Sequence, residues 1–339
     1  MPAITPTADN GVATSNGAHA SAAMVRPLEP VTQAFVDDLS GGKPISSLTP
    51  NEARAVLSSV QQTQVTLADV TTKDVTLPVG PTGQTSIRVF RPADATGVLP
   101  AVIYMHGGGW VMGGPDTHDR LVREIAVGAK AVVVFVDYER SPEARYPVAV
   151  EQGYAVAKYV ADNADKLMVD ARRLVIAGDS VGGNMTAVIA LLAKERRGPK
   201  FIAQLLFYPV TDASMASESY EDFADGPWLT QPSMAWFWDQ YIAKGPERED
   251  IHVSPVNASV DELKGLPTTL LIVDENDVLR DEGEAYGRKL AAAGVRVTSL
   301  RYNGTIHDFM MLNALAGTPA VRAAVGQTVG YLQSVFAGS

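Results

Sequence analysis

Short apolar runs alternate with longer amphipathic segments through most of this chain, and that alternation limits its possible folds more than any other feature. Helical patterns around 118–127, 148–161, 184–195, 282–293 and 320–336 lie between or after the runs, which are 101–105, 131–136, 174–177, 204–208 and 269–273. A strand that is apolar along its whole length has both faces covered, as in a parallel sheet with helices on either side. The sequence therefore predicts an α/β fold with a mostly parallel sheet.

The segments before this alternation have a different pattern. Residues 74–77 and 85–90 alternate in polarity around a Gly/Pro turn at 80–83, which predicts an antiparallel pair at the edge where the chain enters the sheet. Further upstream, 31–39 has a helical apolar pattern, and 49–52 combines a capping box with proline at the first helical position. Two helices are therefore expected before the sheet, and residues 1–23 are expected to form a disordered tail.

Composition excludes several classes of function. The 28 Lys and Arg against 38 Asp and Glu give a net charge of −10, which argues against a nucleic-acid partner. The absence of cysteine excludes disulfides, cysteine-ligated zinc, iron–sulfur clusters and a thiol nucleophile. No apolar run approaches the ~18 residues that span a bilayer, and the first 23 residues lack the basic start and apolar stretch of a leader. We expect a cytoplasmic protein that does not enter a membrane.

A G-x-S-x-G pattern, Gly178 to Gly182, lies where one apolar run ends and a helical pattern begins. A serine on a sharp strand-to-helix turn needs small residues two positions away on either side, because the strand and the helix crowd together there. Ser180 is thus a candidate nucleophile. The pentapeptide alone is a weak signal, and its simpler interpretation is a glycine turn.

A second glycine cluster, residues 106–110, follows the run 101–105. Glycines there can direct backbone N–H groups at one point, and a donor placed where an oxyanion develops contributes ~3–4 kcal/mol. The candidate donors are Gly108, Gly109 and Val181, the last at a helix N-terminus. The alternatives are a flexible loop or a phosphate cradle, but neither G-x-x-x-x-G-K nor G-x-G-x-x-G occurs in the chain.

A serine nucleophile needs a base and an acid that orients it. Of the five histidines, His307 follows the last strand-like run, 297–302, at the edge where parallel strands keep their reactive groups. Asp277 lies on the loop after 269–273, between Asp274 at the strand end and an acidic pair that starts the next helix. The order Ser180, Asp277, His307 matches the order of an α/β-hydrolase. The simpler interpretations are a structural histidine and an exposed acidic loop.

These motifs resemble those of bacterial esterases in the hormone-sensitive-lipase-like family of α/β-hydrolases, and the likeness covers nearly all of the chain after the tail. The matching segments are 106–109, 178–184, 277–282, 307–309 and 137–147. Two departures occur: Val181 where alanine is usual, and Glu139-Arg140-Ser141-Pro142 where Arg-Leu-Ala-Pro is commoner. The resemblance implies an α/β-hydrolase fold with a helical cap and assigns the catalytic aspartate to Asp277.

The alternation stops once, between about 211 and 250, in a stretch that holds three of the four tryptophans. The resemblance implies that 24–62 and 211–250 form the cap, and that 63–210 with 251–339 form the catalytic domain. Aromatic residues near the site are the predicted substrate-binding residues: Trp110, Tyr208, Phe223 and Trp228. Of the adjacent residues 236–238, at most two can face one pocket, since neighbours on a helix point in different directions.

We therefore predict a carboxylic-ester hydrolase that works through an acyl-enzyme on short to medium chain esters, with no metal or cofactor. Ser180 is the nucleophile, His307 the base and Asp277 the residue that fixes the imidazole tautomer. An amidase or lactonase with the same triad is an alternative, and a non-catalytic ligand receptor is a more distant one. The expected partner is a small ester, and the sequence leaves the oligomeric state open, a homodimer included.

Overall fold

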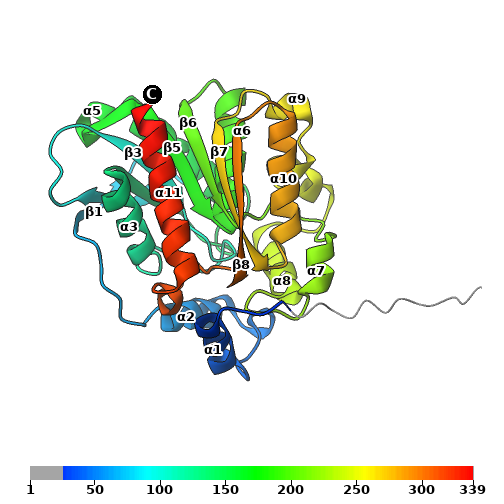
Figure 1. The fold of residues 1–339 in the computed structure, drawn as a ribbon. Helices are drawn as coiled ribbons and strands as arrows, with labels where there is room; N and C mark the ends of the chain where they lie inside the picture. The colour runs from blue at the N-terminus through cyan, green and yellow to red at the C-terminus, as the bar shows by residue number, and fades with distance from the viewer. Residues whose placement is uncertain (1–25, 339) are drawn as a thin grey trace, which may run out of the picture.

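One sheet runs through the centre of the molecule, and helices cover both of its faces (Figure 1). The computed structural model describes residues 26–338, so the predicted tail, 1–23, lies outside the described residues. Within 26–338 the strands are β1 (Val70–Leu77), β2 (Thr85–Pro92), β3 (Leu99–Met105), β4 (Val132–Asp137), β5 (Val169–Asp179), β6 (Phe201–Phe207), β7 (Thr268–Asn276) and β8 (Val297–Ile306).

The strand order is β1-β2-β4-β3-β5-β6-β7-β8. β2 is antiparallel to both β1 and β4, and every other neighbouring pair is parallel. This confirms the predicted mostly parallel sheet and its antiparallel entry edge. All the parallel strands end at the same edge, so the loops after β3, β5, β7 and β8 can meet there.

The helices that flank the sheet include three short ones and five of at least eleven residues. They are α3 (Asp119–Ala129), α4 (Val148–Asp162), α5 (Ala164–Leu167), α6 (Val181–Glu195), α9 (Val260–Leu263), α10 (Arg280–Ala292) and α11 (Pro319–Ala337), with the 3-10 helix η4 (Asn313–Leu315) before α11. α6 and α10 begin two or three residues earlier than the apolar pattern predicts, because glycines and charged residues occupy their first turns.

Alternate residues of β7 show how the two faces are covered. Leu271 and Val273 pack in a cluster with α6 and α10, whereas Leu270 and Ile272 belong to the main core, which also includes residues of α3 and α11. Successive side chains of a strand point to opposite faces, so the two pairs of helices lie on opposite sides of the sheet. Figure 1 shows α3 and α11 side by side on one of these faces.

A second group of helices lies beyond the carboxyl ends of the strands, at the lower end of the molecule in Figure 1. It comprises α1 (Pro30–Leu39), η1 (Ile45–Ser47), α2 (Pro50–Val60), α7 (Glu218–Asp222) and α8 (Gln231–Tyr241). The 3-10 helices η2 (Pro246–Glu249) and η3 (Pro255–Asn257) follow α8, and η3 packs against α6 and α10. The predicted capping box starts α2: Thr49 Oγ1 accepts the N–H of Glu52, whose carboxylate accepts the N–H of Thr49 at 2.8 Å. Helix α2 is therefore fixed at its first residue by local chemistry.

Arg54 ties α2 to the loops at the sheet edge. Its Nε donates to the carbonyl of Val111 at 2.8 Å, and its guanidinium donates to the carbonyl of Ser141 at 3.0 Å and pairs with Glu143 at 2.6 Å. η1 in turn packs against α8. The two segments that the sequence assigned to a cap are thus joined to each other and to the loops after β3 and β4.

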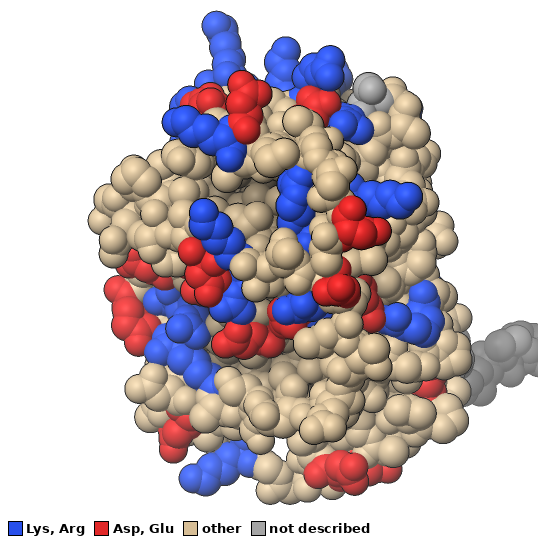
Figure 2. Space-filling model, turned by 90° about the vertical axis from the view of Figure 1, so that its left-hand side faces the viewer, with Lys and Arg blue, Asp and Glu red and all other residues tan. Residues whose placement is uncertain are grey.

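The surface carries mixed charge. On the face shown in Figure 2, Lys and Arg side chains lie among Asp and Glu side chains. Arg88, for example, pairs with Asp74 at 2.6 Å and with Asp116 at 2.7 Å. Among residues 26–338, no helix combines the length and the apolar character needed to cross a membrane.

Candidate active site

Ser180 stands on the turn that the G-x-S-x-G pattern predicts. β5 ends at Asp179, α6 begins at Val181, and Ser180 between them has the left-handed backbone angle φ 55°. A Cβ on Gly182 would overlap the carbonyl oxygen of Met105 on the neighbouring strand β3. The motif glycine is required because strand and helix leave no room for a side chain, and this crowding holds the serine in a strained conformation.

Three predicted residues meet in a hydrogen-bonded series. His307 Nε2 lies 2.9 Å from Ser180 Oγ, and His307 Nδ1 lies 2.8 Å from Asp277 Oδ2. The other oxygen of Asp277 accepts the N–H of Leu279 at 3.0 Å, which fixes the carboxylate. Asp277 directly follows β7 and His307 directly follows β8, so the loops after neighbouring strands supply both partners of the serine.

The charge around His307 favours its protonated form. Burial lowers the pKa of His307, but the carboxylates of Asp277 and Asp308 raise it by more, so that the pKa lies at about 10 rather than the usual 6.5. Asp274 is fully buried, neither of its oxygens has a hydrogen-bond partner among the described residues, and burial raises its pKa well above the ordinary value. Asp277 is therefore the carboxylate that holds the imidazole.

The glycine loop after β3 lies beside the serine. Gly108 and Gly109 both have left-handed backbone angles, φ 105° and 64°, and both line the same cavity as Ser180. A Cβ on Gly109 would overlap the ring of Phe237, so only glycine lets α8 approach the loop this closely. Among the described residues, no acceptor is found for the backbone N–H of Gly108 or Gly109, and the N–H of Val181 opens α6. These N–H groups are available to a ligand.

A buried ionic network, missed in the sequence analysis, fixes this loop to the serine turn. Asp179 Oδ1 accepts the N–H of Gly107 at 3.1 Å and the hydroxyl of Tyr104 at 2.8 Å, and Oδ2 lies 3.2 Å from His118 Nε2. Burial raises the pKa of Asp179, but His118 and Tyr104 lower it by more, so that this pKa lies below its ordinary value. Burial lowers the pKa of His118, and Asp179 raises it by more. A charged pair therefore sits beneath the loop.

No local signal predicts that network. Asp179 lies inside the G-x-S-x-G motif as its variable residue, and His118 precedes a helix, so neither position marks a role. The two residues are 61 positions apart. They meet because β3 and β5 are neighbours in the sheet, so that the segment leading from β3 to α3 lies beside the end of β5. A charged residue inside an apolar strand end is the one sequence clue, since such a residue needs a buried partner.

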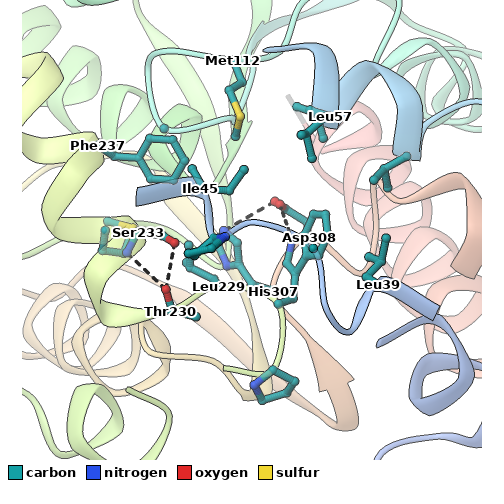
Figure 3. Close-up of a pocket in the computed structure, with 18 of the residues that line it drawn as sticks. Leu39, Ile45, Leu57, Met112, Leu229, Thr230, Ser233, Phe237, His307 and Asp308 are labelled. Carbon is teal, nitrogen blue, oxygen red and sulfur yellow. Dashed lines mark hydrogen bonds and ion pairs between the residues drawn. The ribbon is translucent and has the colours of Figure 1, made fainter. Parts of the chain in front are cut away.

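A cavity of about 580 Å³ opens on Ser180 and His307 (Figure 3). Its walls come from both proposed cap segments and are mostly apolar: the lining residues include Leu39, Ile45, Leu48, Val56, Leu57, Met112, Leu229, Met234 and Phe237. Figure 3 shows Ile45, Met112 and Phe237 around one side of the cavity, with His307 and Asp308 near its centre. Ser180 and His307 thus lie in the wall of an apolar pocket whose size is typical for small ligands.

Of the four predicted substrate-binding residues, Trp228 lines the cavity and three do not. Trp110 is fully buried, stacked on Tyr241 with ring centres 4.0 Å apart. Tyr208 is also fully buried, and its ring meets His307 edge-on at 5.1 Å. The prediction that Trp110 and Tyr208 bind substrate is corrected: neither lines the cavity, because both side chains point into the core beneath the site.

Phe223 is the third correction. It is 9% exposed and lies between the guanidinium groups of Arg26 and Arg280, 5.3 and 5.2 Å from its ring centre. It therefore packs in a cation–π contact away from the cavity. Of the adjacent residues 236–238, only Phe237 lines the cavity, as the helical geometry predicts.

The acidic pair after Asp277 holds the inserted segment. Asp281 accepts the N–H of Ser219 at 2.9 Å, and the buried Glu282 accepts the N–H groups of Thr211 at 2.6 Å and Asp212 at 3.2 Å. Both acids lie in the first turn of α10, as predicted. Their carboxylates fix the start of the insertion to the loop that carries Asp277.

Among the described residues, one group of three side chains has the types and spacing of metal ligands: Asp274, Asp277 and His307. Both ring nitrogens of His307 already face partners, Asp277 on one side and Ser180 on the other. The imidazole therefore has no nitrogen left for an ion, and the donor set fits an acid–base series better than a metal site.

Comparisons with known proteins agree with this geometry. Residues 102–311 match the family described as the α/β-hydrolase fold. The carboxylesterase NlhH of Mycobacterium tuberculosis is 39% identical over 75% of this chain and 80% of its own. An ethyl acetate hydrolase of Pseudomonas putida is 34% identical over 81% of this chain and 88% of its own.

Solved structures show the same fold. The crystal structure of a thermostable esterase from Pseudomonas putida covers 91% of this chain and 97% of its own with a TM-score of 0.89 and 49% identity. The sequence motifs, the sheet topology and the relatives all indicate the same family. The chain belongs to the α/β-hydrolase family, among the carboxylesterases of its hormone-sensitive-lipase-like branch.

Proposed function

We propose that this carboxylesterase forms its acyl-enzyme on Ser180. The observation that carries the proposal is the hydrogen-bonded series Ser180–His307–Asp277, which opens directly on an apolar cavity. A hydroxyl becomes a nucleophile when a base accepts its proton in the same hydrogen bond, and 2.9 Å is within that range.

The steps follow from the positions of the atoms. Ser180 Oγ attacks the ester carbonyl while His307 Nε2 takes its proton, and Asp277 stabilises the resulting imidazolium through Nδ1. The backbone N–H groups of Gly108, Gly109 and Val181 donate to the oxyanion. His307 then gives its proton to the leaving alcohol, and water repeats both steps on the acyl-enzyme.

We assign the cap to 24–62 and 211–250, and the catalytic domain to 63–210 with 251–339. Apolar residues of both cap segments line the cavity, which supports this division. A bounded apolar cavity favours short to medium acyl chains taken up as single molecules. The relative named ethyl acetate hydrolase is in keeping with small esters. A cytoplasmic location and the absence of a nucleic-acid partner stay predictions from the sequence, which leaves the oligomeric state open.

Ser180→Ala tests the proposal. We expect no release of p-nitrophenol from p-nitrophenyl butyrate and an unchanged circular dichroism spectrum, because the hydroxyl contributes little to the core. An organophosphate should add its mass to the wild type and not to the variant. Ser40→Ala is the matched control, since Ser40 lines the same cavity but its hydroxyl donates only to the carbonyl of Asp37 in the last turn of α1. Activity or labelling that survives in folded Ser180→Ala would remove Ser180 from the mechanism.

A further inference from the structure

Asp308 places a carboxyl group inside the cavity beside the reacting atoms. It follows His307 directly with the left-handed angle φ 66°, and its side chain is 14% exposed. It lines the cavity, and Figure 3 shows it next to His307 near the centre of the view. The mechanism above makes no use of this group, although a carboxyl group in an apolar wall is costly unless it has partners.

One oxygen of Asp308 has a firm partner and the other does not. Oδ2 accepts the indole N–H of Trp228 at 3.0 Å, and both residues line the cavity. Oδ1 lies 3.5 Å from His307 Nε2, and no hydrogen-bond donor to it is found among residues 26–338. Asp308 therefore has an acceptor oxygen available to whatever occupies the cavity.

Among the described residues, Asp308 is paired with one ionisable group, His307 at 3.5 Å, and this imidazole carries no charge when it acts as the base. His307, Asp179 and His118 are the ionisable groups that act on the charge of Asp308. Burial raises the pKa of Asp308 above its ordinary value, although His307 and the indole N–H of Trp228 act to lower it. Lys43 and Asp225 also line the cavity, but no ion pair joins either to Asp308 in the described chain.

The position of Oδ1 indicates which part of the substrate it meets. His307 Nε2 gives its proton to the oxygen of the leaving alcohol, so that oxygen must approach Nε2. Asp308 Oδ1 is 3.5 Å from the same nitrogen, which puts the carboxyl group on the side of the alcohol rather than deep along the acyl chain.

We propose that Asp308 is a specificity-determining residue that favours esters whose alcohol carries a cation or a hydrogen-bond donor and disfavours alcohols that carry a carboxylate. The proposal rests on the function assigned to Ser180 and His307. In a partly buried site, a carboxylate that meets a cation or accepts a hydrogen bond changes affinity by about tenfold, whereas a second carboxylate beside Asp308 is repelled. The residue next to the base thereby selects the leaving group.

Two pairs of substrates with matched shapes test this. Butyrylcholine and 3,3-dimethylbutyl butyrate differ in the charge of the alcohol, as do 3-butyryloxypropanoate and 3-methylbutyl butyrate. We expect wild-type kcat/KM to favour the choline ester over its neutral counterpart by about tenfold, and to disfavour the anionic ester. Asp308→Asn should remove both differences while retaining activity on neutral esters. Asp225→Asn, another acid of the same cavity, is the control and should keep them.

A pH profile distinguishes this role from a structural one. Since the carboxylate raises the pKa of His307, Asp308→Asn should also shift the rise of kcat/KM to lower pH. The same role can be tested on the wild-type enzyme alone. Choline should inhibit hydrolysis of p-nitrophenyl butyrate about tenfold more strongly than 3,3-dimethylbutan-1-ol. Equal inhibition by the two alcohols, or substrate ratios unchanged in active Asp308→Asn, would overturn the proposal. Loss of the nucleophile assignment would instead appear as hydrolysis by Ser180→Ala.

Discussion

His307 is surrounded by carboxyl groups, and at the scale of single residues they set the pH range in which it can act. The carboxylates of Asp277 and Asp308 outweigh burial and raise the pKa of His307 to about 10. A raised pKa means that the imidazole keeps its proton to higher pH, and only the neutral imidazole can accept a proton from Ser180. The rate should therefore be low in acid and rise as the pH increases.

The expected result is an alkaline activity profile. kcat/KM for p-nitrophenyl butyrate, measured from pH 5 to 10 and corrected for spontaneous hydrolysis, should rise with a midpoint above the ordinary histidine pKa of about 6.5. Circular dichroism at each pH serves as the control for folding. A midpoint at or below that ordinary value would mean that the neighbouring carboxylates do not act on His307 as their distances suggest.

Asp277 and Asp281 form a matched pair for testing the orienting acid. Asp277→Asn should lower kcat by about 10⁴-fold, because the amide cannot hold the imidazole in the required tautomer. Asp281→Asn should cost far less, since Asp281 pairs with Arg280 at 2.7 Å and holds Ser219 rather than His307. Burst and steady-state kinetics of both variants measure these losses. A larger loss of kcat for Asp281→Asn than for Asp277→Asn would contradict the assignment of Asp277 as the orienting acid.

At the scale of elements, the turn between β5 and α6 leaves no room for added atoms. Gly182→Ala should destabilise the fold by about 1–3 kcal/mol, because the new methyl group would overlap the carbonyl of Met105 and the loop after β3. kcat should fall as well, since Ser180 would move with the turn. Thermal unfolding and kcat measured on the same sample test both effects.

Gly330→Ala is the control, and we expect it to have the opposite effect on the stability of the fold. Gly330 lies inside α11, is exposed, and a Cβ there would meet nothing within 4 Å. Alanine in a helix interior is favoured over glycine by about 1 kcal/mol, so this variant should be more stable and fully active. If Gly182→Ala proved as stable as Gly330→Ala, the strand and helix would not be as crowded as the structure describes.

At the scale of the whole molecule, the cap segments bound the cavity and so limit the substrate. For p-nitrophenyl esters from acetate to palmitate, kcat/KM should rise with about 0.8 kcal/mol for each buried CH₂ and then decline once the chain fills the cavity. Leu57→Phe, which adds volume to the α2 wall, should move the maximum to shorter chains. Val31→Phe is the control, because Val31 is 52% exposed on α1 and does not line the cavity.

The same series tests whether the cap closes over single molecules. Rates on emulsified triolein should stay low and show no jump when the substrate forms an interface. A maximum at palmitate, or such a jump, would indicate that the cap opens onto lipid.

The sequence by itself determined the features that depend on neighbouring residues. Continuous apolar runs predicted the parallel sheet, and glycines two positions either side of Ser180 predicted its sharp turn, because periodicity and backbone sterics act locally. Loops after successive parallel strands share one edge, so the order of the strands indicated Asp277 and His307 as partners of Ser180, and the family resemblance assigned the aspartate to Asp277.

Only the tertiary structure decided where side chains outside these motifs point. Trp110 and Tyr208 pack into the core, and Asp308 turns into the cavity, although each is adjacent to or within a recognised segment. The pair of Asp179 and His118 joins the end of β5 to the start of α3, and these two elements meet only in the folded chain. An aromatic or acidic residue on a loop has several directions available, and the space left by elements distant in sequence selects one of them.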